Sequence, residues 1–141
     1  MIEISSLSRI LTYLALIAAF AFAPAALADK GGTKKADPSG SLSLVLLDST
    51  DGLPHWGQQI TFTATSTAKY DFVTVMCYQS GTWVYGSSKS FGFGSVSPQV
   101  FYLQSAAWTG GAADCNANLW ASTSSGTYLE TLATRSFHVE A

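Results

Sequence analysis

The sequence predicts an all-β domain of about seven short antiparallel strands, folded as a β-sandwich. Three observations carry this prediction. After residue 41, no window repeats its apolar residues at the 3.6-residue period of a helix. Short runs rich in β-branched and aromatic residues recur instead, and turn-forming Gly, Ser, Asp and Pro separate them at intervals of about 8 to 12 residues. Aromatic residues make up 13% of the chain and charged residues only 11%, which supplies ample material for a packed core.

The first 28 residues are predicted to be a secretory signal and not part of the fold. A short start with one acidic and one basic side chain precedes an almost wholly apolar run over residues 10–23. The Ala-Leu-Ala sequence at 26–28 then offers small side chains at the positions that a signal peptidase recognises. We expect cleavage between Ala28 and Asp29, which leaves no membrane span. An uncleaved anchor is the alternative, because the uncharged stretch is near the lower length limit for a span.

Residues 29–41 (DKGGTKKADPSGS) are predicted to form a flexible linker. The segment is rich in Gly, Lys and Ser and has Ala36 as its only aliphatic side chain, so it cannot bury enough apolar surface to order itself. It is either a frayed terminus or a tether that holds the domain away from a surface. The folded domain is therefore expected to span residues 42–141.

The expected strands follow in order through this domain. The second alternates apolar and hydroxyl side chains, as a half-buried strand does. Ser80-Gly81 separates the third strand from the fourth by the spacing of a two-residue hairpin. A Gly- and Ser-rich connection over residues 86–97 follows the fourth. In chain order, the expected strands cover residues 42–48, 59–67, 72–79, 82–85, 99–104, 112–121 and 128–140.

Cys77 and Cys115 are predicted to form a structural disulfide. An exported protein meets an oxidising environment, in which an even number of cysteines is normally paired. The two residues lie in separate predicted strands, each in phase with apolar residues that face inward. Two unpaired thiols or a redox site are the alternatives, but the Cys-x-x-Cys spacing of a catalytic pair is missing from the sequence.

Four segments of the domain carry a resemblance to a known class of folds. They are the opening strand at 42–48, QITFTATST at 59–67, VMCYQSGTWVYG at 75–86 and WTGGAADCNANLW at 108–120. With these segments the chain resembles the small secreted immunoglobulin-like domains of bacteria and phages. The resemblance implies an immunoglobulin-like sandwich used in adhesion, capsid decoration or surface display, without choosing among these roles.

The cysteines depart from the arrangement in antibody domains. Cys77 falls on the third expected strand, and Trp83 follows it after only six residues. Ala113 occupies the position two before Cys115, where a tyrosine corner would place its Tyr. We therefore expect the bridge to join neighbouring strands of one sheet instead of pinning two sheets together.

Few residues point to chemistry. A net charge of −2 with only seven Lys and Arg argues against nucleic acid as a partner. His55 lies in a turn and His138 on the last strand. They are not spaced from each other as metal ligands are, and no third ligand is apparent in the sequence. Asp48 and Asp51 are candidate calcium ligands, although turn formation is the commoner use of such residues. We predict no catalytic residue, no metal and no cofactor.

The aromatic residues are the one feature of the sequence that indicates a binding function. Trp83 and Tyr85 lie two residues apart on one expected strand, so they are predicted to share a face, and Trp120 is out of phase with Cys115. These three rings are the candidate binding surface. The alternative is that they pack in the core, with Trp83 replacing the core tryptophan of antibody domains.

The expected function is that of a secreted or cell-surface module without catalysis, used in surface structure, adhesion or protein contact. A carbohydrate-binding module with exposed aromatic rings is the alternative, so the expected partner is a protein or a glycan at the cell surface. Because charged residues are sparse in the domain, self-association through open sheet edges is also expected.

Overall fold

The computed structural model describes residues 36–91 and 99–141. Throughout these ranges the regular structure is β and no helix occurs, which confirms the prediction of an all-β domain for the residues described. The described strands are seven, as expected, and all their pairings are antiparallel. In chain order they are β1 (Gly40–Leu46), β2 (Gln59–Ser66), β3 (Asp71–Gln79), β4 (Thr82–Ser90), β5 (Phe101–Tyr102), β6 (Ala113–Ser122) and β7 (Tyr128–Val139).

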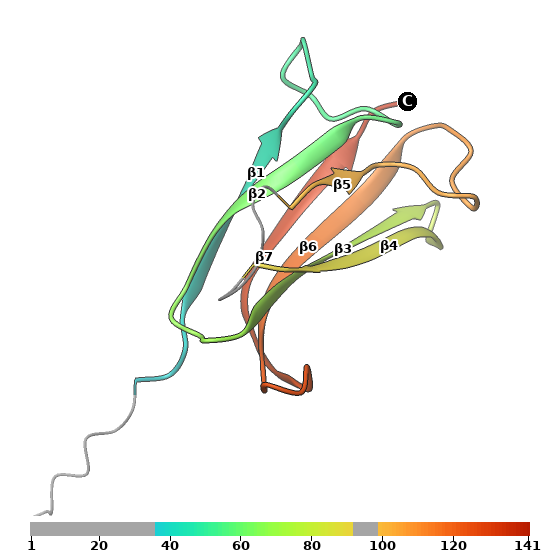
Figure 1. Ribbon diagram of the computed structural model, residues 1–141. Helices are drawn as coiled ribbons and strands as arrows, with labels where there is room; N and C mark the ends of the chain where they lie inside the picture. Colours follow the sequence, from blue (N-terminus) through green and yellow to red (C-terminus); the bar gives the residue numbers. More distant parts are fainter. Residues whose placement is uncertain (1–35, 92–98) are drawn as a thin grey trace, which may run out of the picture. The chain divides into compact units, whose positions relative to one another are not determined.

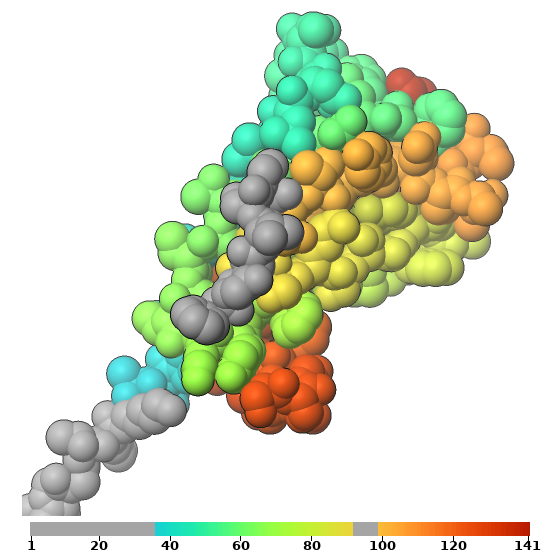
Figure 2. Space-filling view, viewed as in Figure 1, coloured from blue at the N-terminus to red at the C-terminus, as the bar shows by residue number. Residues whose placement is uncertain are grey.

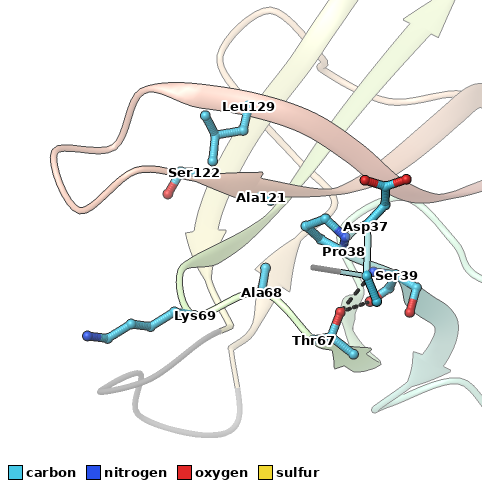
Figure 3. Close-up of a pocket in the computed structure, with 10 residues that line it drawn as sticks. Asp37, Pro38, Ser39, Thr67, Ala68, Lys69, Ala121, Ser122 and Leu129 are labelled. Atoms are coloured by element: carbon cyan, nitrogen blue, oxygen red, sulfur yellow. Dashed lines mark hydrogen bonds between the residues drawn. The ribbon is translucent and has the colours of Figure 1, made fainter. Parts of the chain in front are cut away.

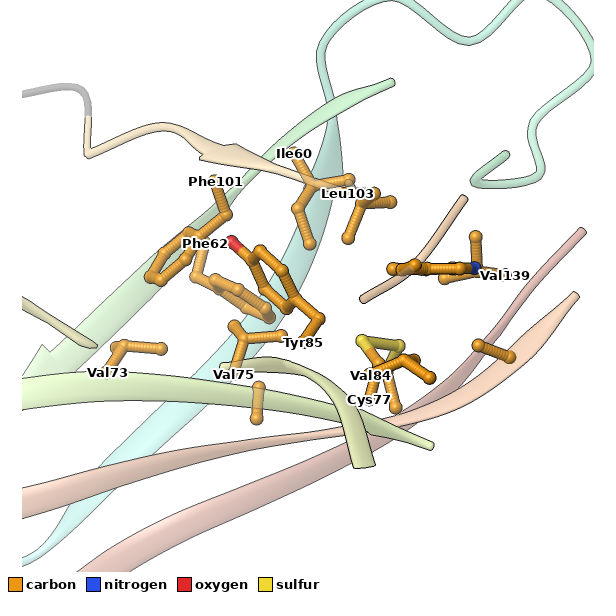
Figure 4. Close-up of a cluster of buried hydrophobic side chains, with 14 of the residues drawn as sticks. Ile60, Phe62, Val73, Val75, Cys77, Val84, Tyr85, Phe101, Leu103 and Val139 are labelled. Carbon is orange, nitrogen blue, oxygen red and sulfur yellow. A yellow bond between two sulfur atoms is a disulfide. The ribbon is translucent and has the colours of Figure 1, made fainter. Parts of the chain in front are cut away.

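The strands form two sheets, of order β1-β2-β5 and β4-β3-β6-β7, which pack face to face as a β-sandwich (Figure 1). Buried side chains of both sheets meet in one core (Figure 4). Along β3 and β6 every second residue is buried, because successive side chains of a strand point to opposite faces. The four-stranded sheet therefore has one apolar inner face and one outer face that is available for function.

Trp108 is the core tryptophan of this sandwich. It comes from the connection between β5 and β6, is fully buried, and donates its Nε1–H to the carbonyl oxygen of Gly111 at 3.0 Å. The connection is held in turn by Gln79, whose Nε2 donates to the carbonyl oxygens of Gly110 and Ala112 at 2.8 and 3.0 Å. Because Trp108 fills the core, Trp83 is not needed there.

The disulfide between Cys77 and Cys115 is present, which confirms the predicted pairing. The two residues lie directly opposite each other on β3 and β6, with their Cα atoms 4.1 Å apart, and both are buried. The bridge therefore joins the two central strands of one sheet, as the positions of the cysteines predicted, and does not link the two sheets.

The predicted hairpin between β3 and β4 is also confirmed. Ser80 and Gly81 both have positive φ angles, of 48° and 82°, which is the conformation of the two-residue turn that suits the twist of paired strands. β4 then continues to Ser90, into the segment expected to be a connection, while β5 is shorter than expected at two residues.

The first strand begins at Gly40, two residues inside the segment predicted to be a linker. Just before it, the backbone N–H of Ser39 donates to Oγ1 of Thr67 at 2.9 Å. Gly40 itself packs closely, since a methyl group there would lie 2.8 Å from Cδ2 of Leu119. The proposed cleavage site at Ala28 and Asp29 lies outside the described residues.

Candidate binding face

The outward side chains of the four-stranded sheet form one continuous surface, which we call the outer sheet face. Strand alternation and the pairing registers assign its members, since residues that lie opposite each other on neighbouring strands point to the same side. They are Trp83, Gly86, Ser88 and Ser90 of β4; Phe72, Thr74, Met76 and Tyr78 of β3; Asp114, Asn116, Asn118 and Trp120 of β6; and Thr131, Thr134, Ser136 and His138 of β7, with Tyr128 of β7 beside Trp120.

One end of the outer sheet face is aromatic. The rings of Phe72 and Trp120 are stacked, with centroids 4.8 Å apart and an interplanar angle of 18°. Tyr128 lies beside them, 5.9 Å from Trp120, and is 57% exposed. Trp120 donates its Nε1–H to Oγ1 of Thr74 at 2.9 Å, so its ring is fixed in direction although it is only partly buried. This confirms that Trp120 points away from the core.

The middle of the outer sheet face is polar and uncharged. Cross-strand hydrogen bonds join Thr74 to Ser88 at 2.8 Å and Asn118 to Thr134 at 2.9 Å. Ser136 donates to Oδ1 of Asn116 at 2.6 Å. Within residues 36–91 and 99–141, the side-chain amide nitrogens of Asn116 and Asn118 make no hydrogen bond, so both remain available to donate to a ligand.

Trp83 places an aromatic ring at the other end of the outer sheet face. It is 55% exposed, which excludes a role as the core tryptophan. A methyl group on Gly86 would lie 2.9 Å from Cζ2 of Trp83, so the indole lies directly over this glycine. Gly86 pairs with Met76 on β3, and the ring therefore sits against the outer side of the sheet.

Tyr85 does not belong to this surface, and the prediction that it shares a face with Trp83 is wrong. It is only 7% exposed and packs in the core with its ring 6.3 Å from that of Trp108, and burial raises the pKa of its phenol. The cause is a β-bulge: Tyr78 pairs with Trp83 and Cys77 with Tyr85, which leaves one extra residue on β4. Such an insertion resets the alternation of side chains along the strand.

The corner of the outer sheet face beyond Tyr78 carries a histidine and an aspartate that contact each other. His138 and Asp114 lie opposite each other on β7 and β6, with Nδ1 2.7 Å from Oδ1. The hydrogen bond to Asp114 raises the pKa of His138, and the negative charges of Asp114 and Glu140 add to this effect. Both side chains are exposed, so the pair is a surface contact.

His55 forms a second pair, with Asp51, in the loop between β1 and β2. Its Nε2 lies 2.8 Å from Oδ2 of Asp51. The hydrogen bond from His55 is the main reason that the pKa of Asp51 falls to about 2, and the same bond raises the pKa of His55. Backbone hydrogen bonds between this loop and Glu140 tie it to the end of β7.

The two aspartates considered as calcium ligands hold their own loop. Oδ1 of Asp48 accepts the backbone N–H of Gln59 at 2.9 Å, and Oδ1 of Asp51 accepts that of Leu53 at 3.0 Å. In the part of the chain that the structure describes, no three His, Cys, Asp or Glu side chains gather as metal ligands would.

A pocket of about 380 Å³ lies where the chain enters β1 (Figure 3). It is enclosed by the segment from Ala36 to Ser39, the turn after β2, and the base of the β6–β7 hairpin. Figure 3 shows Lys69 extending away from the other lining side chains. The lining includes the polar side chains of Asp37, Ser39, Thr67, Lys69 and Ser122, and Oγ1 of Thr67 is hydrogen-bonded to the backbone of Ser39. The turn of the hairpin, at residues 123–127, projects beyond the rest of the domain (Figure 2).

No family model, curated protein or solved structure matches the chain. Residues 36–91 and 99–141 contain no helix long and apolar enough to cross a membrane.

Proposed function

We propose that the chain is an exported, non-catalytic module with an immunoglobulin-like fold, which binds its partner at a surface through the outer sheet face. The observation that carries the proposal is the face itself. Large rings stand at both of its ends, while its middle is a flat array of hydroxyl and amide groups. Exposed aromatic groups grouped on one side of a small domain mark an interaction site.

The order of the strands supports the immunoglobulin-like part of the proposal. If β1 to β7 are lettered A, B, C, C′, E, F and G, the two sheets read A-B-E and C′-C-F-G. The separation of A, B and E from C, F and G is that of immunoglobulin-like domains. The disulfide is the departure, because it joins strands C and F of one sheet where antibody domains join B and F across the sandwich.

Export is supported by the start of the sequence and by the disulfide. The first 28 residues have the order of a secretory signal, and structural disulfides persist in oxidising compartments outside the cytoplasm. A module of this kind serves surface structure, adhesion or protein contact. Self-association remains a further prediction, because β4 and β7 are the edge strands of their sheet and can pair with a strand of another copy. Sedimentation at increasing protein concentration tests it.

The test compares two faces of the same protein. A variant with Ser88→Arg and Ser136→Arg places two large charged side chains on the outer sheet face, and a control with Thr63→Arg and Thr65→Arg places them on exposed positions of β2. Binding of the labelled, secreted protein to cells and cell-wall preparations of the organism that encodes it is measured. We expect the first variant to lose binding and the control to keep it. Equal binding by both would contradict the proposed role of the face.

A further inference from the structure

We infer that the ligand of the outer sheet face is a chain of neutral sugars. The inference rests on the proposed function, because it names the ligand of that same face. A sugar ring presents a flat set of C–H groups above and below and hydroxyl groups around its rim. A surface that recognises a sugar chain therefore needs fixed aromatic rings for stacking and neutral groups that both donate and accept hydrogen bonds.

The aromatic rings of the outer sheet face are placed to stack on two separate units of one chain. Trp83 lies over Gly86, which pairs with Met76, whereas Trp120 pairs with Phe72. Met76 and Phe72 are four residues apart on β3, or about 14 Å, and β4 lies two strand spacings, or about 10 Å, from β6. The two tryptophans are thus roughly 17 Å apart on a diagonal of the sheet. That distance spans several sugar rings.

The polar groups in the middle of the outer sheet face match the rim of a sugar chain. Hydroxyl groups donate and accept, as sugar hydroxyls do, and Thr74, Ser88, Thr134 and Ser136 supply four of them. The amide nitrogens of Asn116 and Asn118 add donors that have no partner within the described residues. Each group is already held by a neighbour across the sheet, so little conformational entropy is lost when a ligand binds.

The charge of the outer sheet face selects against ionic ligands. Its members include no Lys or Arg, and His138 is already paired with Asp114, so an anionic polysaccharide finds no unpaired cationic side chain there. The pair of Asp114 and His138 lies at one corner of the face. The face is therefore complementary to a neutral polymer.

The size of the face favours a sugar chain over a folded protein. Four strands cover about 14 Å between the axes of the outer two, and the stretch from Phe72 to Tyr78 covers about 20 Å. The projected area of the sheet surface is then about 300 Å², which a few sugar rings cover. A folded partner that buries the roughly 800 Å² of accessible surface usual in a stable complex would have to reach beyond this face.

The disulfide lies directly beneath this surface. Cys77 and Cys115 are the inward neighbours of Met76 and Asn116 on β3 and β6, so the bond fixes the spacing of the two strands that carry the middle of the face. A fixed spacing keeps the rings and the polar groups in one geometry, which is what a binding site for a flexible polymer gains most from.

The first experiment is native gel electrophoresis of the secreted protein through gels that contain one soluble polysaccharide each. The neutral probes are hydroxyethylcellulose, laminarin, glucomannan, arabinoxylan and dextran, and polygalacturonate is the charged comparison. We expect retardation by at least one neutral probe and none by polygalacturonate. If no neutral probe retards the protein, or if polygalacturonate alone does so, the inference is overturned.

Variants then place the binding on the face. Trp83→Ala is expected to weaken binding by about tenfold or more, because stacking on an exposed indole is lost while the core is untouched. Tyr102→Ala is the matched control, since this ring is 52% exposed but lies on β5 of the other sheet. Unchanged thermal unfolding shows that both variants are folded. A Trp83 variant that binds as tightly as the original protein would refute the assignment.

A last comparison separates the sugar ligand from the binding role. Cell-wall preparations are treated either with periodate, which cleaves the vicinal diols of sugars, or with a protease. Loss of binding after periodate alone supports a glycan. If protease treatment alone abolishes binding, and variants of the outer sheet face also fail to bind, the sugar ligand is overturned and the proposed function stands. Binding that does not depend on the outer sheet face overturns both.

Discussion

Reduction of the disulfide between Cys77 and Cys115 is expected to destabilise the domain by about 4 kcal/mol. The bridge closes a loop whose ends are 38 residues apart, and the chain-entropy relation gives that free energy for a loop of this length. Domains of this size have total stabilities of about 5–15 kcal/mol, so the loss is a large fraction of the whole. At about 4–8 °C per kcal/mol, the melting temperature should fall by about 15 °C or more.

The assay is guanidinium unfolding of the oxidised and the reduced protein, followed by tryptophan fluorescence. Both cysteines are buried, so the protein is reduced in denaturant and refolded with the reductant still present. Because the cross-link acts on the unfolded chain, reduction should lower the midpoint and also raise the m-value, since the freed chain exposes more surface. The double variant Cys77→Ala/Cys115→Ala should lose more stability than reduction does, because sulfur atoms leave the core. Equal midpoints for the oxidised and reduced proteins would refute the reasoning.

Three further predictions follow from single contacts. Trp108→Ala should cost about 3–5 kcal/mol in guanidinium unfolding, since the largest buried ring is removed, and a loss below about 1 kcal/mol would show that the core does not depend on it. Asp114→Asn should lower the pKa of His138 towards its ordinary value in an NMR titration of the imidazole. Because the pKa of His138 is raised in the folded state, its contact with Asp114 stabilises the domain below about pH 6.5. This contribution is lost as the pH rises through the raised pKa, and the variant should not show that loss of stability. Gly86→Ala should lower the free energy of unfolding by less than about 1 kcal/mol, but it should shift the tryptophan fluorescence, because the exposed ring of Trp83 must move away from the new methyl group. Unchanged fluorescence would contradict the contact.

Much of the fold follows from strand alternation in the sequence. The buried apolar residues of β3 and β6 are those that the alternation of apolar side chains around Cys77 and Cys115 predicted, since a strand has only two faces and one of them is apolar. The turn at Ser80-Gly81 was predictable for a similar reason, because few sequences reach positive φ at two successive residues. The placement of the disulfide within one sheet follows from these two predictions together.

The errors arise where tertiary contacts override local pattern. Strand β4 runs through a Ser-rich stretch that has low strand propensity, but its pairing with β3 from Phe72 onward supplies the hydrogen bonds that hold it in place. The bulge after Trp83 has no sequence signal, and it moved Tyr85 from the surface to the core. Trp108 lies in a connection without alternation, so only the packing of the two sheets shows that it fills the core.

The ends of the described domain lie at opposite ends of the sandwich, which bears on how it responds to force. β1 starts at one end, while the last residues leave at the other, beside the loop between β1 and β2 (Figure 1). Tension between these ends runs along the strands and pulls β1 lengthwise past β2. All seven paired positions from Gly40 to Leu46 then resist together, instead of opening one after another.

If β1 does slide free, the disulfide limits how far the chain extends. The residues between Cys77 and Cys115 stay closed in their loop, which withholds about 130 Å of contour length from the pull. The central strands β3 and β6 remain joined while the segments on either side lengthen. A domain that attaches a cell or a matrix to a fixed surface would thus yield by a bounded distance and keep its two central strands in register for refolding.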